Sequence, residues 1–274
     1  MTRKHLGTAA YHLVALAVVF AVMLPFFWMI STSLKNRGAI MALPVQWIPK
    51  APTLENYVKL FTRDGFMYSM ANSVVVSFAS VALTLVSAAM AAFAFAKLKF
   101  RGSGVLFMVV LATMMIPSQV LFIPLYLLMG ELNLADSLAA LILPSVFKAF
   151  AIFMLRQQMM SIPDAYMEAP AIDGAGLGTT FLRVICPMCK SSFATLAIIC
   201  FMDAWNDYLL PLVMLRTKSK FTLPIILSTL SGQYKNEYSL LMAGALISMV
   251  PILILYAAAQ RFFAAGLQVG GIKG

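Results

Sequence analysis

The chain carries little charge for its length. Of its 274 residues, 11% are Asp, Glu, Lys or Arg and 62% are hydrophobic, and the mean hydropathy is +0.90. A soluble domain carries about 25% charged residues. The composition therefore excludes an ordinary soluble globule and predicts an integral membrane protein.

The sequence also lacks the motifs of nucleotide-binding and catalytic proteins. It contains no GxxxxGK[ST] phosphate loop, and the glycine-rich run 174–178 fits neither that loop nor GxGxxG. The histidines, His5 and His12, lie near the beginning of the sequence and have no metal-ligand spacing. We therefore expect no enzyme activity, no metal site and no cofactor bound by this chain.

Cysteines and signs of nucleic-acid binding are scarce as well. The three cysteines are too few and odd in number for a disulfide framework, so we expect them to pack as small apolar side chains. The net charge of +10 comes from short basic clusters beside apolar runs, such as Lys97, Lys99 and Arg101. This pattern favours membrane lipid headgroups over nucleic acid as partners.

Apolar stretches long enough to cross a bilayer are abundant. A spanning helix needs about 20 apolar residues, and we expect the first such stretch to be a retained anchor because it is too long for a signal peptide. The pattern predicts an all-α membrane protein with six transmembrane helices in one domain, residues 1–274. The expected spans are 9–30, 73–96, 104–129, 134–155, 191–215 and 240–263.

Charge gives only a weak indication of orientation. The positive-inside rule weights short loops close to the membrane, so the basic cluster at 97–101 favours a cytoplasmic N-terminus. The basic residues at 216–220 favour the opposite orientation. Charge alone leaves both orientations open.

The connection 157–190 is unusually polar for this chain. Ser161 is a candidate helix N-cap, Pro163 suits a first turn, and Asp164 suits the positive end of a helix dipole. Gly174 can adopt the left-handed conformation that ends a helix. These residues predict a short helix along the membrane surface, then a turn and a return to the membrane. An ordinary loop and a docking surface fit them equally well.

A second polar group lies within the expected spans. Asp203, Asn206 and Asp207 share one face of a helix at i, i+3 and i+4 spacing. Because a charge at bilayer depth is costly, such residues face a cavity or a partner. They either line a path for a polar substrate, or join subunits and cap a helix near Pro211. Lys148 either belongs to the same path or extends its ammonium toward the membrane surface.

Three motifs follow one another along the chain. The first reads Glu168-Ala169-x-x-x-Asp173-Gly174, then Ile185-x-Pro187. The second reads Trp205-Asn206-Asp207, then Pro211-Leu212. The third reads Gly266-Leu267-Gln268-x-Gly270-Gly271-x-Lys273-Gly274. In this order they resemble the EAA loop, the fifth-span signature and the C-terminal tail of the second permease subunit in ABC importer permeases of the maltose-type carbohydrate family.

The resemblance implies a cytoplasmic coupling helix between the fourth and fifth spans that seats on an ATPase. The residues implied in this contact are Glu168, Ala169, Pro170, Asp173, Gly174 and Pro187. The tail 264–274 is implied as a second ATPase contact, through Gly270, Gly271, Lys273 and Gly274.

Pro170 departs from the family pattern, which usually has alanine at this position. A proline within a helix removes one hydrogen bond and costs about 3 kcal/mol. We therefore expect the coupling helix to end near Ala169, or to kink and restart at Pro170.

The resemblance also implies a set of partners. These are a second permease, two ATPase subunits that bind ATP and Mg, and an extracytoplasmic sugar-binding protein. The chain would lie in the bacterial plasma (inner) membrane, with both termini cytoplasmic, and form half of the pathway of an ATP-driven sugar importer. An importer of glycerol phosphate or another small polar solute, and an ion-coupled carrier, are the alternatives.

Overall fold

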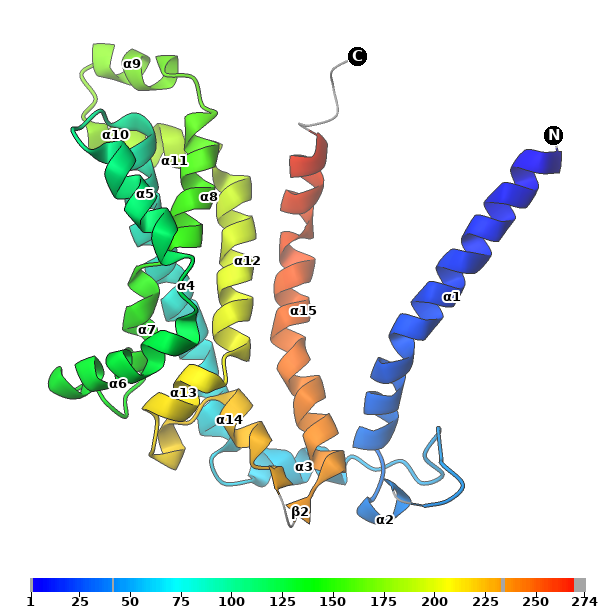
Figure 1. Cartoon of the computed structure of the whole chain (residues 1–274). Coiled ribbons are helices and arrows are strands. Elements are labelled where there is room, and N and C mark those ends of the chain that lie inside the picture. Colours follow the sequence, from blue (N-terminus) through cyan, green and yellow to red (C-terminus); the bar gives the residue numbers. More distant parts are fainter. Residues whose placement is uncertain (1, 41, 233–234, 269–274) are drawn as a thin grey trace. The chain divides into compact units, whose positions relative to one another are not determined.

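The computed structural model describes residues 2–40, 42–232 and 235–268, and their regular secondary structure is almost entirely helical (Figure 1). The other regular elements described are two antiparallel two-residue strands, β1 (Ser231–Gly232) and β2 (Lys235–Asn236). The chain divides into two compact units, residues 1–67 with 226–251 and residues 68–225 with 252–274. The nearly all-helical fold predicted from composition is confirmed.

The first unit is built around the first helix and the segment that follows it. Its elements are α1 (Thr2–Ser33), α2 (Arg37–Ile40), α3 (Glu55–Thr62), the strands, and the first part of α15 (Tyr238–Gln268).

Buried polar contacts fix the chain just after α1. The Asn56 amide donates to the carbonyls of Ser33 (2.7 Å) and Lys35 (2.9 Å), and the Ser239 hydroxyl donates to the Lys35 carbonyl (2.9 Å). The buried Lys35 ammonium lies 4.1 Å from the centre of the Trp28 ring. Burial lowers the pKa of Lys35, and the aromatic ring offsets part of the cost of burying its charge.

The second unit holds most of α4 (Phe66–Lys97) and a series of shorter helices. In chain order these are α5 (Ser103–Thr113), η1 (Ser118–Leu121), α6 (Phe122–Glu131), α7 (Ala139–Ile142), η2 (Leu143–Val146), α8 (Ala149–Met160), α9 (Ala165–Ile172), α10 (Leu177–Thr180), η3 (Phe181–Ile185), α11 (Cys186–Met188), α12 (Lys190–Asn206), α13 (Leu209–Met214), η4 (Lys218–Lys220) and α14 (Leu223–Ser228), which begins in this unit.

Small side chains let the helices of this unit pack closely. Ala88 and Ala92 of α4 are fully buried in one core with Ala151 and Leu155 of α8 and Leu196 of α12. Close approach at small residues is the main packing device between helices in lipid. The three cysteines are free thiols, and two of them are buried.

Among the described residues, four helices are long and apolar enough to cross a membrane. Two further candidates consist of helix pairs bent at a break, Ser103–Thr113 with Ser118–Glu131 at 92° and Leu177–Met188 with Lys190–Asn206 at 79°. The four long helices are Tyr11–Ser33, Phe66–Lys97, Ala139–Met160 and Tyr238–Ala258.

Prolines explain why two expected spans are not single helices. The stretch 104–129 breaks before Pro117, which disfavours helical geometry at the residue before it. The stretch 191–215 breaks at Asp207, which is extended (φ −67°, ψ 122°). Within a continuous helix, the ring of Pro211 would clash with the carbonyl of Asp207 four residues earlier.

Candidate functional site

The short helix α9 lies at one end of the second unit, across the ends of the neighbouring helices (Figure 1). It begins after Asp164 rather than Ser161, so the predicted N-cap is wrong. Ser161 instead ends α8, where its hydroxyl donates to the Gln158 carbonyl (2.7 Å). Gly174 has φ +78° and follows the helix end, as predicted.

Pro170 does not end the helix. α9 continues to Ile172, so the expectation of an end near Ala169, or of a new helix starting at Pro170, is wrong. Pro170 lacks the N–H that would otherwise bond the Tyr166 carbonyl. Its own carbonyl accepts from the Ala175 N–H at 2.8 Å.

The two sides of α9 differ in exposure. Met167 and Pro170 are half-buried and so belong to the inner side. Ile172, an apolar side chain, is 87% exposed. The motif that resembles the EAA loop does not specify Ile172. Ile172 nevertheless lies four residues after Glu168, so the two share one face of the helix. We call Glu168, Ala169, Ile172 and Asp173 the outer side of α9, and Ala165, Tyr166 and Ala171 are exposed as well.

The start of α9 is held by a lysine from another helix. Lys97, the last residue of α4, donates from Nζ to the Ile162 carbonyl (2.5 Å) and to the Asp164 carboxylate (2.7 Å). The hydrogen bond from Lys97 holds the pKa of Asp164 below its ordinary value. The sequence places Lys97 only in a basic cluster, because its partners lie more than 60 residues further along the chain.

Pro187 lies beyond α9, in the short helix α11. It occupies the first turn, where its missing N–H costs nothing. The tail residues implied as a second contact, Gly270, Gly271, Lys273 and Gly274, lie outside the described residues.

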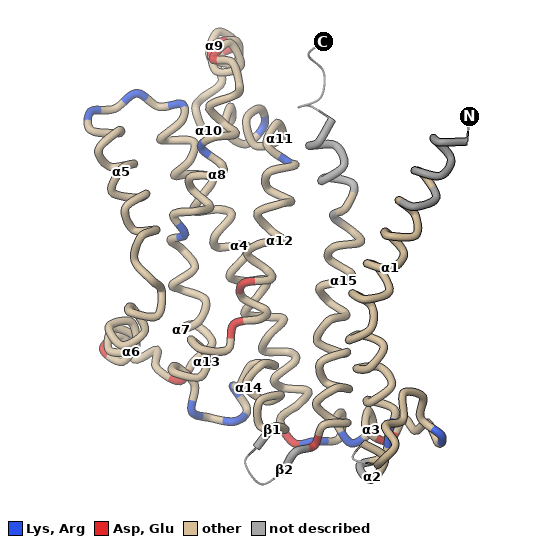
Figure 2. The backbone as a smooth tube through the Cα atoms, turned by 45° about the vertical axis from the view of Figure 1, so that its right-hand side comes forward, with Lys and Arg blue, Asp and Glu red and all other residues tan. Residues whose placement is uncertain are grey.

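Charged residues of the second unit lie mostly at the ends of its helices, and few lie in between (Figure 2). Of the polar residues predicted within the spans, Lys148 and Asp203 come together as an ion pair with an Nζ–Oδ2 distance of 3.0 Å. Asn206 is exposed, and its amide donates to the Met202 carbonyl of its own helix (2.9 Å).

Asp207 has a different position from the one predicted. Because α12 ends at Asn206, Asp207 does not continue the helical face of Asp203 and Asn206. Its carboxylate instead accepts from the Leu210 N–H (3.3 Å) in the first turn of α13. Capping near Pro211 is therefore the structural role of Asp207.

The ion pair within the spans leads to a testable expectation. Asp203→Ala leaves the Lys148 ammonium without its carboxylate, and a lone charge at bilayer depth costs about 3 kcal/mol. We expect a lower unfolding temperature for the protein in lipid nanodiscs, and recovery in the Lys148→Met/Asp203→Ala double variant. A single variant as stable as the wild type would show that the pair does not matter.

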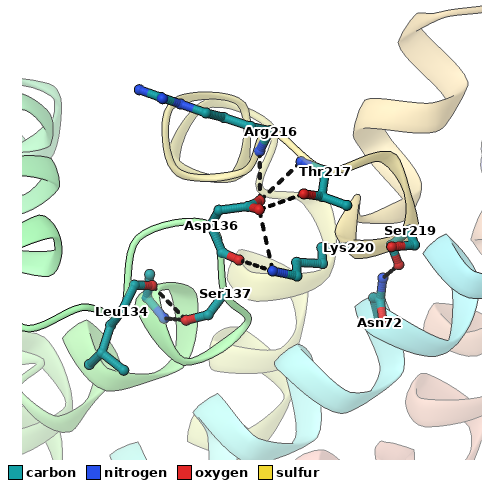
Figure 3. A network of polar contacts seen from close by, with 9 residues as sticks. Asn72, Leu134, Asp136, Ser137, Arg216, Thr217, Ser219 and Lys220 are labelled. Atoms are coloured by element: carbon teal, nitrogen blue, oxygen red, sulfur yellow. Dashed lines mark hydrogen bonds and ion pairs between the residues drawn. The ribbon is translucent and has the colours of Figure 1, made fainter.

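A polar cluster is centred on Asp136, in the connection between α6 and α7 (Figure 3). In Figure 1, α6 and α13, which flank this cluster, lie at the opposite end of the second unit from α9. The Asp136 carboxylate accepts from the Thr217 hydroxyl (2.6 Å), from the N–H groups of Thr217 (3.0 Å) and Arg216 (2.8 Å), and from Lys220 Nζ (3.3 Å). These hydrogen bonds, led by that of the Thr217 hydroxyl, hold the pKa of Asp136 well below its ordinary value.

The same cluster holds the residues that follow α13 against neighbouring parts of the second unit. Lys220 also donates to the Asp136 carbonyl (2.6 Å), and the Arg216 guanidinium bonds the Tyr126 hydroxyl. Asn72 of α4 donates to the Ser219 carbonyl (2.9 Å). The segment is therefore fixed from two neighbouring parts of the unit.

Long apolar helices and two bent helix pairs define a multi-pass membrane protein. The chain belongs to the family of binding-protein-dependent transport system inner membrane components, whose model matches residues 84–269. This membership places it among transport components of the inner membrane rather than among enzymes.

Individual relatives agree with the family. The chain is 37% identical over 260 residues to the arabinooligosaccharides transport system permease protein AraQ of Halalkalibacterium halodurans, covering 94% of this chain and 93% of that protein. It is 34% identical over 261 residues to the trehalose transport system permease protein SugB of Mycobacterium tuberculosis, covering 94% of both. The resemblance to carbohydrate importer permeases is confirmed.

The fold also matches a solved structure. A chain from the crystal structure of a bacterial ABC transporter involved in the import of the acidic polysaccharide alginate superposes with a TM-score of 0.83. The match covers 96% of this chain and 98% of the other at 23% identity, and it shows that the two share a fold.

Proposed function

We propose that the chain is one of two permease subunits of an ATP-driven bacterial sugar importer, and that α9 is the helix that docks a cytoplasmic ATPase. The observation that carries this proposal is the outer side of α9, where the exposed Ile172 is flanked by Glu168 and Asp173. An exposed apolar side chain within a polar rim is typical of a contact with another protein. Ala169 leaves room for close approach.

The docking assignment determines the orientation that we propose. With α9 in the cytoplasm, the Asp136 cluster at the opposite end of the second unit faces the extracytoplasmic side. Counting each bent helix pair as one span gives six spans, and an even number places both termini in the cytoplasm. The tail residues Gly270 to Gly274 are then available as a second ATPase contact.

The complete transporter needs three further kinds of subunit. A second permease forms the other half of the pathway, two ATPase subunits bind ATP and Mg, and an extracytoplasmic protein delivers the sugar. ATP binding brings the ATPases together, and the coupling helices follow. The bundle then exchanges an inward-facing cavity for an outward-facing one, so this chain transmits force and lines the path.

The polar residues within the spans fit a neutral, hydroxyl-rich substrate. Asp203 and Asn206 are exposed in this chain and offer oxygen acceptors for sugar hydroxyls. Lys148 is already paired with Asp203, which disfavours the anionic glycerol phosphates. Arabino-oligosaccharides and trehalose, carried by the relatives above, are the first candidates to test.

The proposal is tested by purifying the tagged chain from bacterial membranes together with the proteins expressed from neighbouring genes. We expect a second permease and an ATPase to co-purify. In proteoliposomes, ATP hydrolysis should rise when the binding protein is added with one sugar from a panel that also includes glycerol phosphate. Uptake that needs an ion gradient but no ATP would instead identify an ion-coupled carrier.

A further inference from the structure

Lys97 joins two parts of the chain that the proposed function requires to move together. We propose that Lys97 is a positioning residue for coupling, which links the base of α9 rigidly to the end of α4 so that a displacement of α9 is passed to this long helix. The proposal rests on the docking role of α9. It adds the residue through which the movement enters the bundle.

The contacts of Lys97 lie on both sides of one residue at the base of α9. Its Nζ donates to the carbonyl of Ile162 (2.5 Å) and to the carboxylate of Asp164 (2.7 Å), and Pro163 lies between them. Asp164 directly precedes the first residue of α9. The lysine therefore holds the turn that carries the helix.

The burial of Lys97 makes this link stronger than an ordinary surface ion pair. Its side chain is 2% exposed, whereas that of Asp164 is 74% exposed. An exposed pair contributes little because both charges are readily solvated. A buried ammonium is tolerated only while it is paired and hydrogen-bonded. Moving the base of α9 away from α4 would break these contacts, so the two are expected to move as one body.

The residues around the Lys97 link are packed and hydrogen-bonded, so they can transmit a displacement. Ile162 is 5% exposed and belongs to the main core of the second unit. Close by in the chain, Arg156 of α8 donates to the Phe95 carbonyl of α4 (3.2 Å), and its guanidinium lies 4.0 Å from the centre of the Phe107 ring of α5. α4, α5 and α8 are thus joined near the point where α9 is attached.

The first test of the link measures the distance between α9 and α4. Spin labels at Ala171→Cys on α9 and Met90→Cys on α4, in a background without the native cysteines, report their separation by pulsed electron resonance. In the purified complex with its ATPase, we expect the same narrow distance distribution before and after trapping with MgATP and vanadate. In Lys97→Met we expect the distribution to broaden or shift on trapping. A shift of the unaltered pair, or no difference in Lys97→Met, overturns the proposal.

The second test is a cycle of variants read by ATP hydrolysis in nanodiscs, as the stimulation given by the sugar-loaded binding protein over the basal rate. We expect Lys97→Met to lower this stimulation about tenfold, a typical size for coupling between sites, and Lys97→Arg to retain most of it. Asp164→Asn removes only the charge of its contact with Lys97 and should lower the stimulation less. It should have no additional effect in the Lys97→Met background, because that change has already removed the whole contact. Lys99→Met is the matched control, since Lys99 is exposed and lies two residues away.

Each outcome of these measurements either supports or contradicts the link through Lys97. If Lys97→Met does not accumulate, Asp164→Asn alters only an exposed side chain, and unchanged stimulation in that variant overturns the link. Additive effects of the two changes, or an equal loss in Lys99→Met, overturn it as well. If no ATPase co-purifies with the unaltered chain, the proposed function itself has failed, and this result is distinct from a failure of the link.

Discussion

Exchange of Glu168 for lysine is expected to lower substrate-stimulated ATP hydrolysis by about 100-fold. In the proposed complex Glu168 is covered by the ATPase, and reversing its charge there would leave its partner group on the ATPase facing a like charge. Glu168 is exposed on the outer side of α9, in the first turn of the helix. An acid there also complements the positive end of the helix dipole, which lysine would oppose. The measurement is ATP hydrolysis by the reconstituted complex with and without sugar-loaded binding protein.

Pro170→Ala provides the control within the same helix. Pro170 is half-buried on the inner side, and alanine restores an N–H for the Tyr166 carbonyl. We therefore expect stimulation to be kept or increased. Intact stimulation in Glu168→Lys would contradict the docking role of α9.

Asp136→Ala is expected to have a large effect on the stability of the second unit. The change leaves the N–H groups of Arg216 and Thr217 and the Lys220 ammonium without a shared acceptor. Losing hydrogen bonds to a charged acceptor in this way costs about 3 kcal/mol. We expect a lower unfolding temperature in nanodiscs and faster proteolysis between residues 215 and 221. Glu131→Ala is the control, because Glu131 is an exposed acid in the same part of the chain.

The pH dependence of this cluster has a definite sign. Because the pKa of Asp136 is lower in the folded protein, its contribution to stability is complete above the ordinary carboxyl pKa of about 4 and declines as the pH falls below it. We expect the difference in unfolding temperature between wild type and Asp136→Ala to be constant from pH 5 to 8 and to shrink toward pH 3. A difference that changes near pH 7 would assign the effect to another group.

The local pattern of apolar and polar residues in the sequence was sufficient to predict much of the fold. The apolar stretches predicted long helices because burial in lipid requires a closed set of backbone hydrogen bonds. The acids and Gly174 predicted a short helix ending at a left-handed residue, and α9 is that helix. Its start differed because Ser161 satisfies the end of the preceding helix, and the sequence alone does not decide which of two adjacent helices a serine caps.

Contacts between distant residues could not be predicted. Lys97 and Asp164, like Asp136 and Lys220, are brought together only by the packing of the helices that carry them. The position of Asp207 beyond the end of α12 has a local cause, since Pro211 four residues later is incompatible with a continuous helix. A proline at that spacing after a polar residue therefore indicates a cap more than a continued helical face.

The inward position of Pro170 has a consequence for the exchange of subunits between transporters. The half-buried side of α9 is not presented to the ATPase that we propose, so the replacement of the usual alanine leaves the outer residues Glu168, Ala169 and Asp173 in place. An ATPase shared among several importers would meet the same outer surface on this chain as on one with alanine at that position. Pro170 is therefore expected to be no barrier to such sharing.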